Sequence, residues 1–220
     1  MIGQEIRDRV FRDTKDYYIQ SHEICLPLVE FAKKFAGKKI LDLGCAAGNY
    51  CLELSKNGFE MKGADINPAY VKRAQEAGVD AHALEALPSF GDKSFDSVLL
   101  FEVLEHLADP ARTLTEAKRL AKKNVLITVP NCEKIEELQH YGLIPEHFSD
   151  LDHKNFFTPE TLETLLKAHF NKTEVWKGDP INPVALMGNP LTRLAGKVIK
   201  RLGVMPPRFY FRLYAVASID

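Results

Sequence analysis

The residues best suited to chemistry begin with Asp42, which stands near the end of a short strand-like stretch. A turn of small residues follows, running from Gly44 through Cys45 and Ala46 to Gly48. Side chains no larger than a methyl or a thiol allow a ligand to approach the backbone. A strand, such a turn and a following helix form a nucleotide-sized site at the carboxyl edge of a sheet. A carboxylate just before the first glycine suits a ligand that carries an ammonium and a sulfonium better than it suits a diphosphate.

A second acidic residue, Asp65, ends the next predicted strand and lies 21 positions beyond Gly44. An acidic side chain at this place can accept hydrogen bonds from both ribose hydroxyls of a nucleotide. An aspartate before Asn67-Pro68 is also a good turn former. The functional interpretation is favoured because Asp65 occurs together with Asp42 and the small-residue turn.

A third group of polar residues, Glu102, Glu105 and His106, follows an apolar strand predicted at 95–101. If Glu102 opens a helical turn, Glu105 and His106 share its face. These side chains can move protons, or together with His153 they can bind a divalent cation such as Mg²⁺ or Mn²⁺. A structural capping role is the third alternative. We favour the acid–base interpretation without a metal, with catalytic candidates His106 first, His153 second and Glu105 beside them.

Strands and helices alternate along the chain. Strands are predicted at 39–43, 59–64, 79–83, 95–101, 124–129, 172–177 and 210–217, and helices at 24–35, 48–57, 67–77, 109–121 and 158–169. This order predicts an α/β fold, a doubly wound three-layer α/β/α sandwich around a mostly parallel seven-stranded sheet.

The domain organisation follows from length and from two interruptions of this alternation. A chain of 220 residues is expected to form a single domain, 1–220, that starts with a helical cap at about 1–36. The stretches 133–154 and 179–208 break the strand–helix order. We expect them to be helical lids over the ligand edge, because long insertions in α/β domains are usually functional.

Composition narrows the function classes. The net charge of −1 offers no general attraction to nucleic acid or to anionic membranes. The sequence has no apolar segment of about 20 residues that would cross a bilayer, and its charged first residues do not resemble a signal peptide. Four cysteines without a CxxC pair are typical of reduced thiols. We therefore expect a cytoplasmic protein, with its oligomeric state left open.

Several motifs in order resemble one family. They are 41–48 (LDLGCAAG), 64–66 (ADI), 87–88 (LP), 94–96 (SFD) and 101–107 (FEVLEHL). Together they resemble class I S-adenosylmethionine-dependent methyltransferases with a Rossmann-like fold, over roughly residues 25–175. The E-x-x-E-H pattern with a later histidine is similar to the metal sites of small-RNA 3′-end 2′-O-methyltransferases and of ubiquinone-pathway O-methyltransferases.

The resemblance implies that the cofactor is S-adenosyl-L-methionine, with S-adenosyl-L-homocysteine as product. It implies that the 44–48 turn packs against the amino-acid part of the cofactor, with Asp42 near its ammonium and sulfonium. Asp65 would hold the ribose hydroxyls, and Ile66 would lie on one face of the adenine. Phe101 and Glu102, at the end of the fourth strand, would complete the cofactor site.

Two positions depart from the family pattern. The family commonly reads adenine with an acidic residue followed by a backbone amide, and here Ala83 and Leu84 stand at those positions. Glu85 is the candidate replacement for the missing carboxylate. The glycine usual at Ala46 is also absent, which tightens the turn by one methyl group.

The acceptor is expected to be a small molecule, and its methylated atom is expected to be oxygen rather than nitrogen or carbon. Residues 181–219 contain six basic residues and no acidic one: Arg193, Lys197, Lys200, Arg201, Arg208 and Arg212. Residues 191–202 also have the apolar spacing of an amphipathic helix. One interpretation is a lid helix with a solvated basic face, and the other is a cap that recognises an anionic or partly lipidic acceptor.

Three alternative functions remain at this point. An RNA 2′-O-methyltransferase that uses a metal fits the E-x-x-E-H pattern, but the near-neutral chain argues against nucleic acid. A nicotinamide-dependent oxidoreductase would need a glycine at Asn49 and would set its diphosphate against Asp42. A catalytically inactive cofactor-binding module is disfavoured by the polar residues that collect beyond the strand ends.

Overall fold

The computed structural model describes residues 24–134, 136–137, 152–180, 194, 198 and 209–219. The first 23 residues of the expected N-terminal cap lie outside this part of the chain. So do most of the expected lids 133–154 and 179–208, with the amphipathic segment 191–202 apart from two of its residues. In the described part, no helix is long and apolar enough to cross a membrane.

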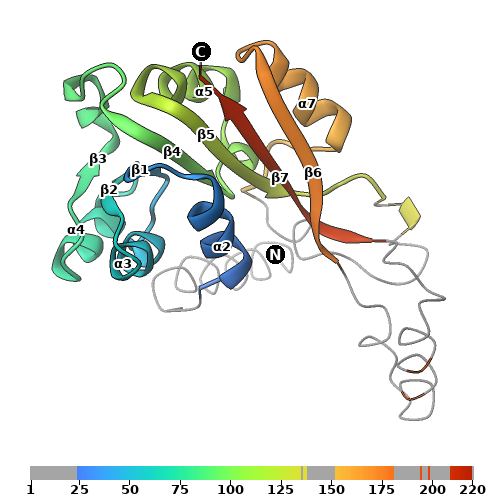
Figure 1. Ribbon diagram of the computed structural model, residues 1–220, viewed down its shortest axis with the longest axis horizontal. Coiled ribbons are helices and arrows are strands. Elements are labelled where there is room, and N and C mark those ends of the chain that lie inside the picture. The colour runs from blue at the N-terminus through green and yellow to red at the C-terminus, as the bar shows by residue number, and fades with distance from the viewer. Residues whose placement is uncertain are drawn as a thin grey trace, which may run out of the picture.

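In this part of the chain, seven strands form one sheet in the order β3-β2-β1-β4-β5-β7-β6 (Figure 1). They are β1 (Lys39–Leu43), β2 (Glu60–Asp65), β3 (Ala81–Ala83), β4 (Phe95–Phe101), β5 (Ala121–Pro130), β6 (Lys172–Pro180) and β7 (Tyr210–Ser218). Strands β1 to β5 pair in parallel, whereas β7 runs antiparallel to both β5 and β6. The predicted mostly parallel seven-stranded sheet is confirmed.

The helices predicted to start at 67, 109 and 158 begin within one residue of those positions. The helices described are α2 (Leu26–Phe35), α3 (Asn49–Lys56), α4 (Pro68–Glu76), α5 (Pro110–Leu120) and α7 (Pro159–Lys167). Asn67, Asp109 and Thr158 cap α4, α5 and α7, each accepting a hydrogen bond from a backbone N–H in the first turn. A proline follows each cap, where its fixed φ favours the helix and its missing N–H costs nothing.

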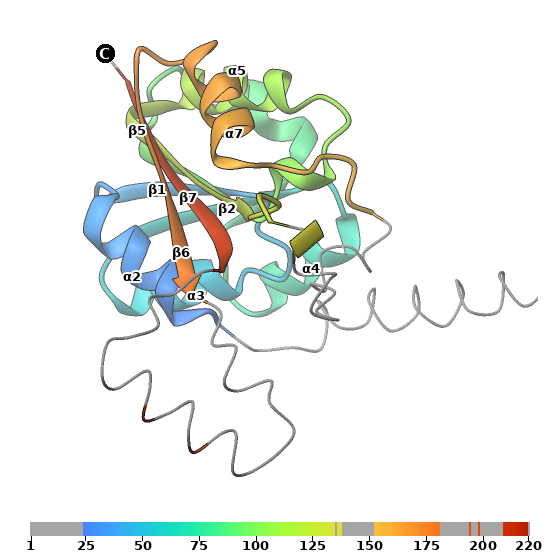
Figure 2. The same ribbon diagram turned by 90° about the vertical axis from the view of Figure 1, so that its right-hand side faces the viewer.

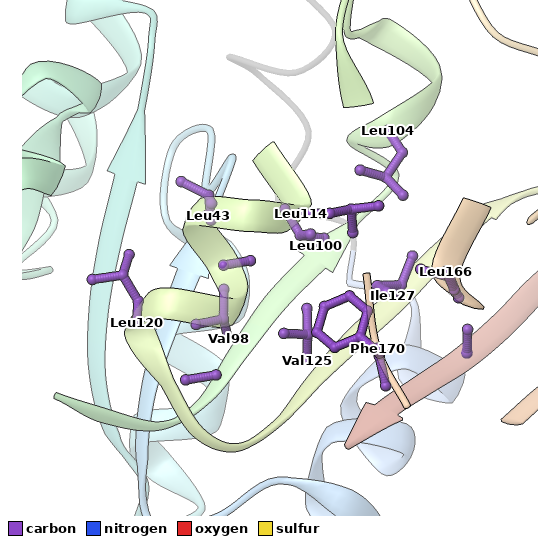
Figure 3. Packing of buried hydrophobic residues seen from close by; sticks show 14 of the residues in the cluster. Leu43, Val98, Leu100, Leu104, Leu114, Leu120, Val125, Ile127, Leu166 and Phe170 are labelled. Atoms are coloured by element: carbon purple, nitrogen blue, oxygen red, sulfur yellow. The ribbon is translucent and has the colours of Figure 1, made fainter. Parts of the chain in front are cut away.

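The helices cover the sheet on both sides and complete three layers. Figure 2 shows α5 and α7 on one face and α2 and α3 on the other. On the first face, Leu114 and Leu120 of α5 and Leu166 of α7 pack with Val98 and Leu100 of β4 (Figure 3). All five side chains are fully buried, and burial of a leucine-sized side chain is worth about 1.5–3 kcal/mol.

The opposite face is built on aromatic side chains. Phe31 of α2 stacks on Phe101 at the end of β4, with ring centroids 5.9 Å apart, and meets Tyr214 of β7 edge-on at 5.1 Å. These contacts hold α2 against the carboxyl half of the sheet. The end of β4 is therefore fixed by packing from both faces.

Some boundaries differ from the prediction. Strand β5 starts at Ala121 instead of residue 124, because Ala121 still pairs with Phe95 beyond an irregularity in the β4–β5 register. Strand β6 continues through Pro180, into the stretch expected to be a lid. The 3₁₀ helices η1 (Leu84–Ser89) and η2 (Leu104–His106) were not predicted, since such short turns carry no periodic signal.

Candidate functional site

The small-residue turn after β1 adopts a backbone that few side chains tolerate. Gly44, Ala46 and Gly48 all have positive φ, at 91°, 45° and 80°. A Cβ on Gly44 would lie 2.6 Å from Cγ2 of Val103, so this position needs glycine. Ala46 adopts the left-handed conformation despite its methyl group, at a cost of about 1–2 kcal/mol. The observed turn therefore keeps the compact form expected from its composition.

Asp42 is buried beneath this turn, with 2% of its surface exposed. Its Oδ2 accepts a hydrogen bond from the Cys51 thiol at 3.6 Å. Burial raises the pKa of Asp42 to about 7, the thiol hydrogen bond opposes this, and the nearby charge of Asp65 adds to it. In the part of the chain that the structure describes, no Lys, Arg or His forms an ion pair with Asp42. Such a carboxylate is suited to a cationic ligand.

Asp65, at the end of β2, supports the turn. Its Oδ2 accepts the backbone N–H of Ala46 at 2.9 Å, and its Oδ1 accepts that of Asn67 at 2.8 Å. Each carboxylate oxygen has two lone pairs, so capacity remains for one further donor on each oxygen. Ile66 beside it is 73% exposed, which is unusual for a large apolar residue next to a buried one. The pair fits a ribose diol and an adjacent flat ring.

The candidates after β3 lie on η1. Leu84 is half-buried and packs against the core cluster of the α5 face, whereas Glu85 in the same turn is exposed. The position of Glu85 beyond β3 keeps it as a candidate for the adenine amino group.

The residues that end β4 diverge from the prediction. Phe101 is buried in the aromatic face against α2, where its ring stacks on Phe31. Glu102 has a φ of 54°, and its Oε1 accepts a hydrogen bond from Nε of Arg212 at 2.9 Å. The expectation that Glu102 opens a helical turn shared with Glu105 and His106 is wrong. The 3₁₀ helix starts two residues later, and Arg212 directs the Glu102 side chain toward β7.

Arg212 itself was missed as part of the site. It is 8% exposed, and it forms an ion pair with Asp179 as well as with Glu102. Burial disfavours its charge, but Glu102, then Cys25 and Asp179, outweigh burial and keep the pKa of Arg212 above its ordinary value. A basic residue inside a strand that is otherwise apolar was the available signal, because arginine is seldom buried unless paired. Tyr214 also donates to Asp179 at 2.9 Å.

Glu105, His106 and His153 are brought together from two distant segments. One ligand atom from each lies within 4.8 Å of the others, and the two imidazole centroids are 4.6 Å apart. Glu105 is 1% exposed, while both histidines are half-buried. Glu102, the fourth member of the expected metal set, is not part of this cluster. The structure thus gathers all three catalytic candidates.

Tyr70 on α4 is under the electrostatic influence of both regions of the site. Burial raises the pKa of Tyr70, and the carboxylates of Asp65 and Asp152 raise it further. Asp152 directly precedes His153, so the segment that carries this histidine approaches the region of Asp65.

Comparison with known proteins agrees with this geometry. A family model described as a methyltransferase domain matches residues 17–171, more than half of the chain. The chain belongs to the class I S-adenosylmethionine-dependent methyltransferases. The resemblance inferred from the motifs is confirmed. Membership of this family argues against the alternative of a nicotinamide-dependent oxidoreductase. The residues present fit the cofactor, since Asp42 supplies a buried anion, Asp65 supplies acceptors and Ile66 supplies an apolar surface.

Curated relatives of this methyltransferase include two ubiquinone biosynthesis O-methyltransferases. The protein from Dinoroseobacter shibae is 28% identical over 166 residues, which cover 69% of this chain and 66% of the relative. The protein from Ruegeria sp. is 31% identical over 166 residues, covering 68% and 66%. The chain spans about two thirds of the length of these relatives.

Solved structures share the fold. An S-adenosylmethionine-dependent methyltransferase from Archaeoglobus fulgidus has a TM-score of 0.66 at 22% identity, covering 96% of this chain and 99% of that one. Magnesium protoporphyrin IX methyltransferase from Synechocystis PCC 6803, solved with bound S-adenosylhomocysteine, has a TM-score of 0.58 at 16% identity, with coverages of 100% and 95%. The predicted Rossmann-like methyltransferase fold is confirmed.

Proposed function

We propose that this methyltransferase transfers a methyl group from S-adenosylmethionine to an oxygen atom of a small-molecule acceptor. The observation that carries the proposal is the meeting of Glu105, His106 and His153 at the carboxyl edge of the sheet. The O-methyltransferase relatives support oxygen as the target. A hydroxyl must lose a proton when it is methylated, and two imidazoles beside a carboxylate offer a route for that proton.

In the proposed mechanism the protein aligns the reactants and moves one proton. S-adenosylmethionine, when bound, supplies an electrophilic methyl group on a sulfonium. Asp42 would lie opposite the positive end of the bound cofactor and Asp65 would hold its ribose, which would orient the donor. A neutral nitrogen of His106 accepts the acceptor's hydroxyl proton. Buried Glu105 and the neighbouring His153 stabilise the imidazolium that results.

The basic residues near the C-terminal end of the chain bear on the acceptor class. Of the six basic residues in 181–219, Arg212 lies within the described residues, and its charge is taken up by Glu102 and Asp179. An anionic or partly lipidic acceptor therefore depends on the other five. A small molecule remains our proposal over RNA, because the chain as a whole is close to neutral.

The direct test is methyl transfer from isotope-labelled S-adenosylmethionine to a panel of phenols, carboxylic acids, amines and short RNAs. We expect a product whose label sits on oxygen, shown by mass spectrometry and by the methyl carbon shift in NMR. A product labelled only on nitrogen or carbon would contradict the oxygen assignment. Activity on the short RNAs alone would mean that the acceptor is RNA instead of a small molecule.

A divalent cation at the same cluster is a second candidate, favoured by the 4.8 Å grouping of three ligand atoms. Without Glu102, the donors are two imidazole nitrogens and one carboxylate. This set suits Mn²⁺, Fe²⁺ or Zn²⁺ better than Mg²⁺, which prefers oxygen. If the cation is required, chelator treatment abolishes activity and one of these metals restores it. Full activity in metal-free buffer would mean that the cluster acts in acid–base catalysis without a metal.

A further inference from the structure

Asn155 joins the two segments that carry the histidine pair. Its side-chain Nδ2 donates hydrogen bonds to the carbonyls of Leu104 at 3.0 Å and Leu107 at 2.7 Å, 51 and 48 positions away in the chain. Its backbone N–H donates to the carbonyl of Glu105 at 3.0 Å, and that of Lys154 donates to the same oxygen at 2.7 Å. Three carbonyls in and just after η2 are thus bound by two consecutive residues.

The bonded segments hold the functional side chains between them. His106 belongs to η2, and His153 lies two residues before Asn155. Just beyond Asn155, Phe157 forms a parallel bridge with Asn131, and its carbonyl accepts the N–H of Cys132 at 2.8 Å. The segment is therefore anchored to β5 on one side of Asn155 and to η2 at Asn155 itself.

The chemistry of the side chain singles out Asn155. Both acceptors are backbone carbonyls, so the contact needs two donors from one short side chain, which an amide NH₂ provides. An aspartate of the same shape has no donor when ionised and would face two carbonyl oxygens. Glycine, alanine or serine would leave at least one carbonyl without this partner. The carbonyls of a short 3₁₀ helix have few partners within the helix itself.

We propose that Asn155 is a positioning residue, which sets the spacing and orientation of the His106 and His153 imidazoles without touching the substrate. The inference rests on the proposed function, in which this pair handles the acceptor's proton. Catalysis is sensitive to placement, since a shift of about 1 Å can cost roughly 10²-fold in rate. Asn155 joins two segments that are far apart in sequence, so the loss of its side chain would allow such a shift.

The test compares Asn155→Asp and Asn155→Ser with a matched control, Asn124→Ala. Asn124 is also half-buried and also links separate segments, donating to Phe35 at 2.9 Å and accepting from Ser97 at 2.6 Å. It lies at the amino edge of the sheet, because it pairs with Ser97 near the start of β4. Asn155→Asp and Asn124→Ala each lose two side-chain hydrogen bonds, so the thermal stability of both variants should fall.

The first readout needs no acceptor. Nuclear Overhauser contacts between the ring protons of His106 and His153 report their spacing, with peaks assigned from His106→Gln and His153→Gln. We expect these contacts in the wild type and in Asn124→Ala, and their loss in Asn155→Asp. Calorimetric affinity for S-adenosylhomocysteine should change less than about twofold in every Asn155 variant. Retained ring contacts in a folded Asn155→Asp protein would overturn the positioning role.

The second readout is kcat with the acceptor found by labelled transfer. We expect kcat to fall by roughly 10–10²-fold in Asn155→Asp and less in Asn155→Ser, which keeps one donor, with Asn124→Ala near wild type. Lost ring contacts with an unchanged kcat would also overturn the proposal. If instead His106→Ala retained full kcat, the proposed function would fail. The ring contacts would still test whether Asn155 positions the two histidines.

Discussion

Two parts of the carboxyl edge of the sheet, the β1–β2 edge and the β4 edge, hold their functional side chains in place by different means. At the β1–β2 edge (Asp42, the 44–48 turn and Asp65), the turn is held by bonds among residues close in sequence, since Asp65 reaches Ala46 across 19 positions. At the β4 edge (Glu102, Glu105, His106 and His153), the partners are Asn155, about fifty positions away, and Arg212, 110 positions away. The first edge is encoded locally, whereas the second exists only in the assembled fold.

The largest expected effect lies at the β4 edge. His106→Ala should lower kcat by roughly 10²–10⁴-fold, the usual contribution of a general base, and should leave calorimetric affinity for S-adenosylmethionine unchanged. His169→Ala is the control, because His169 follows α7 and its Nδ1 contacts the carbonyl of Leu165. A loss of kcat of less than a few-fold in His106→Ala would mean that this histidine only lines the site.

The reverse separation is expected at the β1–β2 edge. Asp65→Ala should weaken S-adenosylmethionine binding by roughly 10²-fold or more, since each hydrogen bond to a charged group is worth about 1.5–3 kcal/mol. Asp80→Ala is the matched control, an exposed aspartate that pairs with Lys62 and His82. Unchanged calorimetric affinity in Asp65→Ala would remove the ribose assignment.

Asp42 should make cofactor binding depend on pH. Its pKa is raised to about 7 by burial, and the cationic cofactor binds the ionised form. Affinity should therefore rise up to tenfold per pH unit as the pH approaches 7 and level off above it. Calorimetry between pH 5.5 and 8.5 measures this slope, and a flat profile would contradict the pairing of Asp42 with the cofactor.

The stability of the protein without cofactor should change in the opposite direction. Because folding raises the pKa of Asp42, its contribution is fully present below about pH 4 and is lost as the pH rises through about 7. Asp42→Asn should thus raise the free energy of unfolding at pH 8, by about 1 kcal/mol or more, while it abolishes tight cofactor binding. Equal stabilities of the two proteins at pH 8 in urea titrations would argue against a buried charge.

The smallest expected effect concerns the turn itself. Ala46→Gly removes a methyl group from a left-handed residue, so it should raise the free energy of unfolding by up to about 1 kcal/mol. Gly44→Ala is the contrasting variant and should destabilise by about 1–3 kcal/mol, because its Cβ would meet Val103. If thermal denaturation ranked the two variants the other way, the turn would differ from the one described.

The same contrast explains which features were predictable from sequence. Strands β1 and β4 were predicted to the residue, and the helix caps at Asn67 and Thr158 were found, because apolar periodicity and capping are local signals. Asp42 and Asp65 followed from spacing in the same way. The direction of Glu102 did not, since its left-handed backbone and its bond to Arg212 depend on β7. The role of Asn155 could not be predicted from the sequence, because its side chain binds backbone carbonyls, which every residue has.

The placement of β7 bears on how the chain is assembled during synthesis. Strand β7 follows β6 in sequence yet lies between β5 and β6 in the sheet. Until β7 leaves the ribosome, β5 has no neighbour on its outer side and β6 cannot join the sheet, so apolar strand edges stay open to other nascent chains. The counter-ion of Glu102 arrives with the same strand. Closure of the sheet and neutralisation of that carboxylate are thereby a single late event.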